Sequence, residues 1–92
     1  MAAPLFSLGR VVATPKALNT LLTAGQDPAE LLDRHRSGDW GEVPPEDAKE
    51  NWFSVAHGFR ILSSYRVGEG RIWIITEADR SSTCILLPAD SL

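Results

Sequence analysis

Two histidines are the side chains in this sequence best suited to proton transfer near neutral pH, and acidic residues lie close to both. His35 is followed by Asp39, and a histidine beside a carboxylate can serve as a general acid or base. Neither His35 nor His57 has a recognisable nucleophile or orienting partner, and both end predicted helices, where an imidazolium favours the negative end of the dipole. The sequence therefore predicts no catalytic residue and no enzyme. A small hydrolase centred on His35 and Asp39 is the alternative, and it requires a pocket that holds a nucleophile.

The remaining reactive side chains lack the spacing that metal or cofactor sites require. Cys84 is the only cysteine, so it forms no internal disulfide, and its place among isoleucine and leucine predicts a small core residue. No CxxC or HxxxH spacing brings metal ligands together. The fragments GEGR and LGR match neither the GxGxxG nor the P-loop pattern of phosphate-binding loops. We therefore expect no metal and no cofactor.

Composition sets the scale of the molecule. With 92 residues, 43% apolar and 23% charged, the chain has the profile of one globular α+β domain over residues 1–92 with a single core. No apolar run approaches the roughly 18 residues of a membrane-spanning helix, so we expect no membrane partner. The first residues, MAAPLFSLGRVV, lack the basic and long apolar regions of a secretory signal, which predicts a cytoplasmic protein.

Four β-rich runs and three helices can be read along the chain. The predicted strands are Leu5–Ala13, Phe59–Val67, Ile72–Ala78 and Thr83–Leu87, with Gly9 as a bulge or a site of close backbone approach. The predicted helices run from Pro15 to Gly25, from Pro28 to Gly38 and from Pro45 to His57, each bracketed by N-terminal proline and C-terminal glycine. The fold class is therefore α+β in the order β-α-α-α-β-β-β, an antiparallel sheet of three or four strands with helices on one side. The expected core comprises Leu18, Leu22, Leu31, Trp52, Val55, Ile61, Ile72, Ile74, Ile85 and Leu87.

Alternation in the last three strands predicts a second sheet face that is also apolar. If GEGR and DRSS are both four-residue loops, Val67 opposes Ile72, Ala78 opposes Thr83, and Arg66 lies over the indole of Trp73. A three-residue first turn would instead place Tyr65 on the side of Trp73. A solvated face rarely gathers so many apolar side chains, so another subunit, a partner, the N-terminal segment or curling of the sheet should cover it.

The first functional hypothesis is a non-catalytic interaction or accessory module that binds itself, as a homodimer, or another protein through that face. Trp40 lies in an acidic linker, where it either fills the core or acts as an aromatic anchor. The expected interaction surface comprises Trp40, Arg66, Trp73, Ile75 and Leu86.

An acidic central region supports a second hypothesis. Residues 25–50 contain eight acidic and three basic side chains, a net charge of −5, and the pI of the chain is about 5.2. An acidic surface disfavours direct nucleic-acid binding, because the phosphate backbone requires positive charge. The alternative function is therefore an acidic regulator of a nucleic-acid-processing or defence enzyme, which binds through Glu46, Asp47 and Glu50.

The segments GRVVATP, AGQDPAELLDRHRSGDWG, RILSSYR, WIITEADRSST and ILLP together resemble a family of small uncharacterised bacterial proteins. Its members are called hypothetical, plasmid-related or, in some cases, restriction-system subunit M. The resemblance covers nearly the whole chain, and SGDWG followed by WIITEADRS is its most specific part. It implies a bacterial, mobile-element or accessory-gene setting, and it brings no catalytic residues to this chain.

Overall fold

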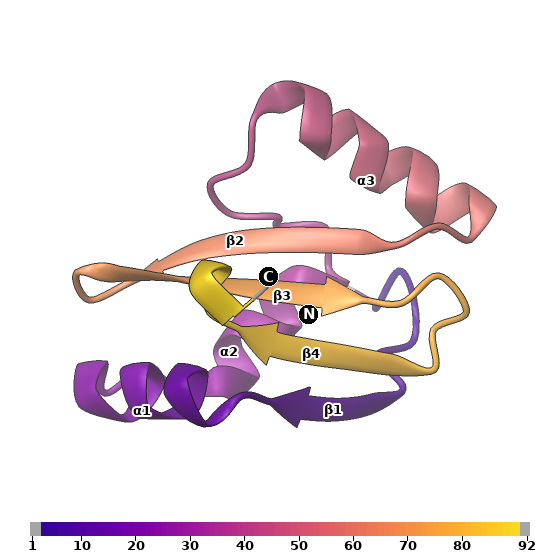
Figure 1. Ribbon diagram of the computed structural model, residues 1–92. Coiled ribbons are helices and arrows are strands. Elements are labelled where there is room, and N and C mark those ends of the chain that lie inside the picture. The colour runs from indigo at the N-terminus through magenta and orange to yellow at the C-terminus, as the bar shows by residue number, and fades with distance from the viewer. Residues whose placement is uncertain (1–2, 91–92) are drawn as a thin grey trace.

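A mixed four-stranded sheet lies at the centre of the computed structural model, which describes residues 3–90 (Figure 1). The strands are β1 (Arg10–Ala13), β2 (Ile61–Val67), β3 (Gly70–Thr76) and β4 (Ser82–Leu86). Their order across the sheet is β1-β4-β3-β2. The pairs β2–β3 and β3–β4 are antiparallel, but β1 runs parallel to β4. The predicted α+β class is confirmed, and the sheet is mixed rather than purely antiparallel.

Three helices follow the first strand, as predicted: α1 (Pro15–Ala24), α2 (Pro28–Arg36) and α3 (Pro45–His57). The side chains of Thr14 and Asp27 accept hydrogen bonds from the first turns of α1 and α2, which satisfies backbone N–H groups that lack intrahelical partners. A short 3-10 helix, η1 (Pro88–Asp90), follows β4. Among residues 3–90, no helix is both long and apolar enough to cross a membrane.

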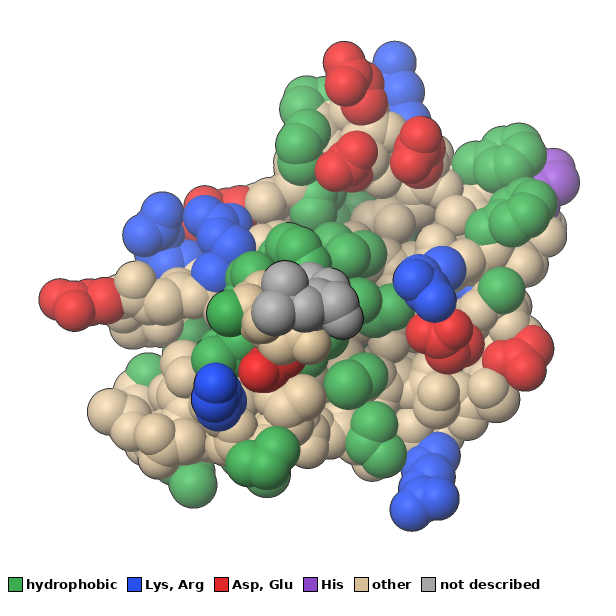
Figure 2. Space-filling view, viewed as in Figure 1, with side chains coloured by type: hydrophobic (Ala, Val, Ile, Leu, Met, Phe, Trp, Pro, Cys, Tyr) green, Lys and Arg blue, Asp and Glu red, His purple; other side chains and the backbone are tan. Residues whose placement is uncertain are grey.

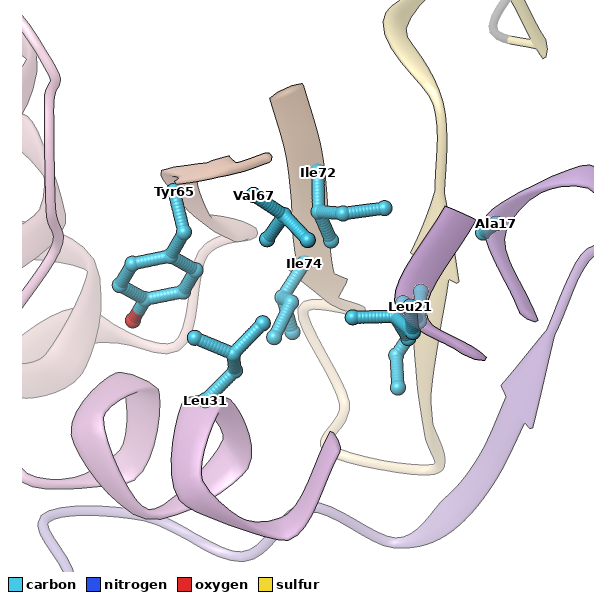
Figure 3. Close-up of a cluster of buried hydrophobic side chains, with 8 residues drawn as sticks. Ala17, Leu21, Leu31, Tyr65, Val67, Ile72 and Ile74 are labelled. Atoms are coloured by element: carbon cyan, nitrogen blue, oxygen red, sulfur yellow. The ribbon is translucent and has the colours of Figure 1, made fainter. Parts of the chain in front are cut away.

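The core lies between the sheet and helices α1 and α2, whereas α3 lies beside β2 and η1 lies on the opposite side of the sheet (Figure 1). Side chains from both helices meet the core face of the sheet (Figure 3). The core cluster comprises Ala17, Leu21, Leu31, Tyr65, Val67, Ile72, Ile74 and Ile85. Burying an aliphatic or aromatic side chain of this kind stabilises the fold by about 1.5 to 3 kcal/mol.

Three residues expected in the core are exposed instead. Leu18, Leu22 and Trp52 keep 44%, 79% and 49% of their surface in contact with solvent. In α1 the buried stripe is Ala17 and Leu21, one helical turn apart, because the small alanine allows the helix to approach the sheet closely. Leu18 and Leu22 therefore lie on a side of α1 that does not face the core.

The first strand is shorter than predicted because the chain turns at Gly9. Its φ is +63°, and a Cβ there would lie 2.4 Å from the backbone oxygens of Arg80 and Ser81. The predicted close backbone approach is thus present, and it allows Arg10 to begin the pairing with β4. Residues 5–8 form a loop under the core face, where the Leu8 carbonyl accepts a hydrogen bond from Thr83.

Both hairpins differ from the predicted register by two residues. Val67 pairs with Gly70 rather than Ile72, and Thr76 rather than Ala78 pairs with Thr83. The first connection is a two-residue turn in which Gly68 has φ +59°, a conformation that glycine adopts without steric cost. Because side chains alternate with a period of two, an even shift leaves the two faces of the sheet unchanged.

Candidate interaction surfaces

The second face of the sheet, opposite the core face, carries a continuous set of apolar side chains. Cross-strand pairing aligns Leu62, Ile75 and Cys84 in one row, and Trp73 with Leu86 in the next. Leu62, Trp73, Ile75 and Cys84 are half-buried, whereas Leu86 keeps only 8% of its surface. Tyr65 lies on the core face of the sheet, whereas Trp73 lies on the second face. Leu86 therefore contributes little to the outer surface of the predicted contact region.

Trp40 does not belong to the predicted interaction surface, because it is buried and keeps only 5% of its surface exposed. Its ring packs against Phe6, His35 and Trp52 on the core side. Backbone hydrogen bonds hold it there: Ser64 donates to the Trp40 carbonyl at 3.0 Å, and Glu42 donates to the Ser64 carbonyl at 2.7 Å. Among residues 3–90, no acceptor lies within hydrogen-bond distance of the buried indole nitrogen.

Arg66 is exposed, but it lies opposite Arg71 and not opposite Trp73 as predicted. The two-residue shift of the hairpin register causes this change. Both guanidinium groups contact Glu42 instead, at 3.4 and 3.3 Å, and Arg71 also donates to the Ser64 hydroxyl. The hydrogen bond and charge of Arg66 hold the pKa of the Glu42 carboxyl below its usual value. Arg66 and Arg71 lie where β2 and β3 approach their connecting turn, so this ion-pair cluster lies at the turn end of the two strands.

Helix α3 forms an acidic wall along the β2 edge of the second face. A groove of about 240 Å³ separates it from β2, lined by Asp47, Glu50, Asn51, Ser54, Arg60 and Leu62. Glu46, Asp47 and Glu50 are exposed and form no ion pair with other residues of the described chain. Acidic side chains gather over α3 at the top of the space-filling view, together with a basic side chain, and hydrophobic side chains lie below them (Figure 2).

The outer edge of β2 is closed by its own chain. The Asn51 side chain imitates a neighbouring strand at Leu62: its amide donates to the carbonyl at 2.8 Å, and its oxygen accepts from the N–H at 3.2 Å. One pair of residues further along, the segment from Trp40 to Glu42 bonds to Ser64 in the same way. Covering an edge strand prevents pairing with other chains. A partner at this end therefore meets side chains rather than free backbone.

Replacing Asn51 with leucine is expected to lower the free energy of unfolding by about 1 kcal/mol or more, because two part-buried hydrogen bonds to the backbone of Leu62 are lost. Chemical denaturation measures this change. Asn19→Leu, at an exposed position of α1, is the matched control and should change stability little. Equal stability of Asn51→Leu and the wild type would contradict the role assigned to Asn51.

An exposed aromatic cluster at the end of α3 was not predicted from the sequence. The ring of Phe53 stacks on the rings of His57 and Phe59, with centroids 4.0 and 5.8 Å apart. Phe53 and Phe59 keep 55% and 53% of their surface exposed. The sequence could have indicated this cluster, because Phe53 is a large apolar residue that does not share the buried face of α3 with Asn51 and Ser54. Exposed aromatic rings are frequent anchors of protein contacts.

His35 is buried in a chain of hydroxyl groups and is not paired with Asp39. Its Nδ1 lies 2.6 Å from the Ser63 hydroxyl, and its Nε2 lies 2.9 Å from the Thr76 hydroxyl. Thr76 is bonded in turn to Thr83, which donates to the Leu8 carbonyl. The Asp39 carboxylate is bound by Arg34 instead, at 2.6 Å, and this hydrogen bond lowers the pKa of Asp39.

This arrangement does not provide what a hydrolase centred on His35 requires. Ser63 is within reach as a nucleophile, but the second ring nitrogen meets a threonine where a triad has a carboxylate. Both His35 and Ser63 have no exposed surface. The cluster therefore acts as an internal polar network in which each group satisfies its neighbour.

Cys84 is half-buried on the second face, and burial is the main cause that raises the pKa of its thiol. A raised pKa leaves less of the nucleophilic thiolate at neutral pH. His, Cys, Asp and Glu side chains of residues 3–90 form no group of three that could hold a metal ion. The chain matches no protein-family model, no curated protein and no solved structure. Function is therefore inferred from the acidic wall and the apolar second face.

Proposed function

We propose that this protein is a non-catalytic interaction module that binds a partner protein between α3 and the second face of the sheet. The partner segment is amphipathic, with apolar residues on one side and lysine or arginine beside them. The observation that carries this proposal is that carboxylates of α3 line a groove beside β2. Leu62 in that groove continues, through its pairing with Ile75, into an apolar floor that also includes Trp73 on β3.

The floor supplies the apolar half of the contact. Trp73, Ile75 and Leu62 lie on three adjacent positions of β2 and β3, and each retains accessible surface. Half-buried side chains are already fixed by their neighbours, so a partner that covers them loses little conformational freedom from this side. Tryptophan is among the residues that contribute most when an interface buries them.

The wall supplies the charge. Glu46, Asp47 and Glu50 are exposed and free of intramolecular ion pairs within residues 3–90, so they are available to cations on a partner. Charges at the rim of an interface act mainly on the association rate and on the choice of partner. The acidic regulator of a nucleic-acid-processing or defence enzyme is one form of this proposal, since such enzymes present basic surfaces.

The test uses two synthetic amphipathic peptides that share leucines on one face and carry either lysine or glutamate on the other. Titration into the isotopically labelled protein, followed by NMR, should show binding of the lysine peptide, with shifts at Trp73 and along α3. Trp73→Arg and Glu50→Lys should each weaken this binding by about tenfold. Higher salt should also weaken it, because exposed charges are screened.

Two variants control for general effects of charge and surface change. Leu22→Arg changes an exposed leucine on α1, and Glu69→Lys makes the same charge change as Glu50→Lys at the β2–β3 turn. Both should bind the lysine peptide as the wild type does. Equal affinity for the two peptides, or shifts confined to surfaces away from α3 and Trp73, would overturn the proposal.

A further inference from the structure

The two edge strands of the sheet, β2 and β1, differ in whether their outward backbone groups are hydrogen-bonded. At the β2 edge, Asn51 and the segment from Trp40 to Glu42 occupy the outward backbone groups. At the β1 edge, no hydrogen bond within residues 3–90 reaches the outward side of the strand. Figure 1 shows β1 as the last strand at that side, and no helix or strand of the described residues runs beyond it. An open edge of this kind is a template for pairing with another strand.

The outward groups of β1 can be identified from its pairing. Arg10 and Thr14 donate their N–H groups to carbonyls of β4 and the residue before it, at 3.0 and 2.9 Å. Because backbone groups alternate in direction along a strand, the N–H and C=O groups of Val11 and Ala13 point away from the sheet. Val11 and Val12 also expose 42% and 41% of their side chains. The edge thus offers four backbone groups among apolar side chains.

We propose that the β1 edge pairs antiparallel with the β1 edge of a second copy of this chain, which joins two sheets into one of eight strands. With Val12 opposite Val12 of the second copy, Val11 faces Ala13 in both directions. This register satisfies all four outward groups in each copy with four hydrogen bonds in total. A pairing centred on Val11 or Ala13 would form only two such bonds, so the geometry selects Val12 as the two-fold position.

Charge complementarity supports a second copy as the occupant. In this register Arg10 of one copy lies opposite Thr14 of the other, and directly opposed residues share a face of the sheet. The Thr14 hydroxyl already donates to the Asp90 carboxylate at 2.7 Å, so Asp90 lies beside the position that Arg10 would reach. Arg10 is exposed and forms no ion pair within residues 3–90. The two-fold symmetry brings Arg10 to Asp90 twice, once on each side of Val12.

The contact is independent of the binding surface proposed above. Val12 and Arg10 lie in β1, at the opposite edge of the sheet from β2 and α3. Pairing of a four-residue strand buries a small area. We therefore expect a weak dimer, with a dissociation constant of about 10 µM to 1 mM. Dimerisation would place two acidic walls on one assembly.

Sedimentation equilibrium over that concentration range should show reversible dimerisation of the wild type. Val12→Lys places two ammonium groups against each other at the two-fold position and should leave only monomer. Arg10→Glu sets a carboxylate beside Asp90 and should weaken the dimer by about tenfold or more. Amide exchange at Val11 and Ala13 should slow as the concentration rises.

Two controls make the same changes at the far edge of the molecule: Phe53→Lys for Val12→Lys, and Lys49→Glu for Arg10→Glu. Both should dimerise as the wild type does, and so should Trp73→Arg, which separates this inference from the proposed function. A wild type that stays monomeric up to about 1 mM would overturn the inference. Dimers that persist in both Val12→Lys and Arg10→Glu, or unchanged exchange at Val11 and Ala13, would also overturn it.

Discussion

Replacing Gly41 with alanine is expected to lower the free energy of unfolding by about 3 kcal/mol or more. Gly41 has φ +73°, and a Cβ added there would lie 2.1 Å from the Ser64 backbone oxygen and 2.6 Å from the Tyr65 ring. No side-chain rotation relieves a contact with backbone. The linker from Trp40 to Glu42 would have to leave β2, and its two hydrogen bonds to Ser64 would be lost.

Displacing this linker should have further effects, since it holds several buried groups in place. The Tyr65 hydroxyl donates to the Asp39 carbonyl at 2.6 Å, and Trp40 fills the space between Phe6 and Trp52. Burial raises the pKa of Tyr65 to about 12. Gly41→Ala should therefore open Trp40 to solvent, and its fluorescence should shift to the red.

Gly25→Ala is the matched control for Gly41→Ala. Gly25 has φ +66° but nothing within 4 Å of an added Cβ, so it isolates the conformational cost, about 1 kcal/mol. Urea denaturation of the two variants beside the wild type measures both changes. A loss of stability in Gly41→Ala no larger than that in Gly25→Ala would show that the linker does not need its contact with Ser64.

Features that depend on neighbouring residues could be predicted from the sequence. The bounds of α3 match the prediction because Pro45 and Gly58 act locally, one through a fixed φ and the other at φ +75°. The two faces of the sheet were also correct, because alternation survives a register error of two residues.

Features that depend on distant contacts could not be predicted. Trp40 is buried because its backbone pairs with Ser64, and β1 runs parallel to β4, a strand near the other end of the chain. Local propensity carries no information about such contacts. Arg80 has φ +61° and donates hydrogen bonds to the carbonyls of Ser54, Phe59 and Glu77. No sequence motif predicts that Arg80 connects these segments.

The buried histidine leads to the second large effect, a loss of stability between pH 6.5 and 4. The pKa of His35 is lowered from its usual 6.5 to about 4, first because burial disfavours the charged ring and second because Arg80 adds positive charge nearby. In the unfolded chain the same histidine binds a proton below about pH 6.5. Within that window the unfolded state therefore holds one proton more than the folded state.

The sign of the effect follows from this difference in proton binding. Stability rises with pH wherever the unfolded state binds more protons, so the contribution of His35 is complete above pH 6.5 and is lost as the pH falls toward 4. A shift of this size corresponds to about 3 kcal/mol over the whole window. Within the window, the slope should approach about 1.4 kcal/mol per pH unit.

His35→Gln separates this contribution from that of the carboxylates. Asp39, Asp79 and Asp90 have pKa values below their usual range and also lose stabilisation in acid, but the variant shares them with the wild type.

The variant should be less stable at pH 7, because a glutamine cannot match the hydroxyls of Ser63 and Thr76 at the same geometry. Its free energy of unfolding should nevertheless fall more slowly than that of the wild type between pH 6.5 and 4.5. NMR of the His35 ring in the folded protein should show it neutral from pH 6.5 down to about pH 5. Parallel stability curves for variant and wild type would contradict the assignment. Because His35 joins α2 to Thr76 of β3, and through Thr76 to Thr83 of β4, its protonation in acid is expected to weaken the packing of α2 on the centre of the sheet.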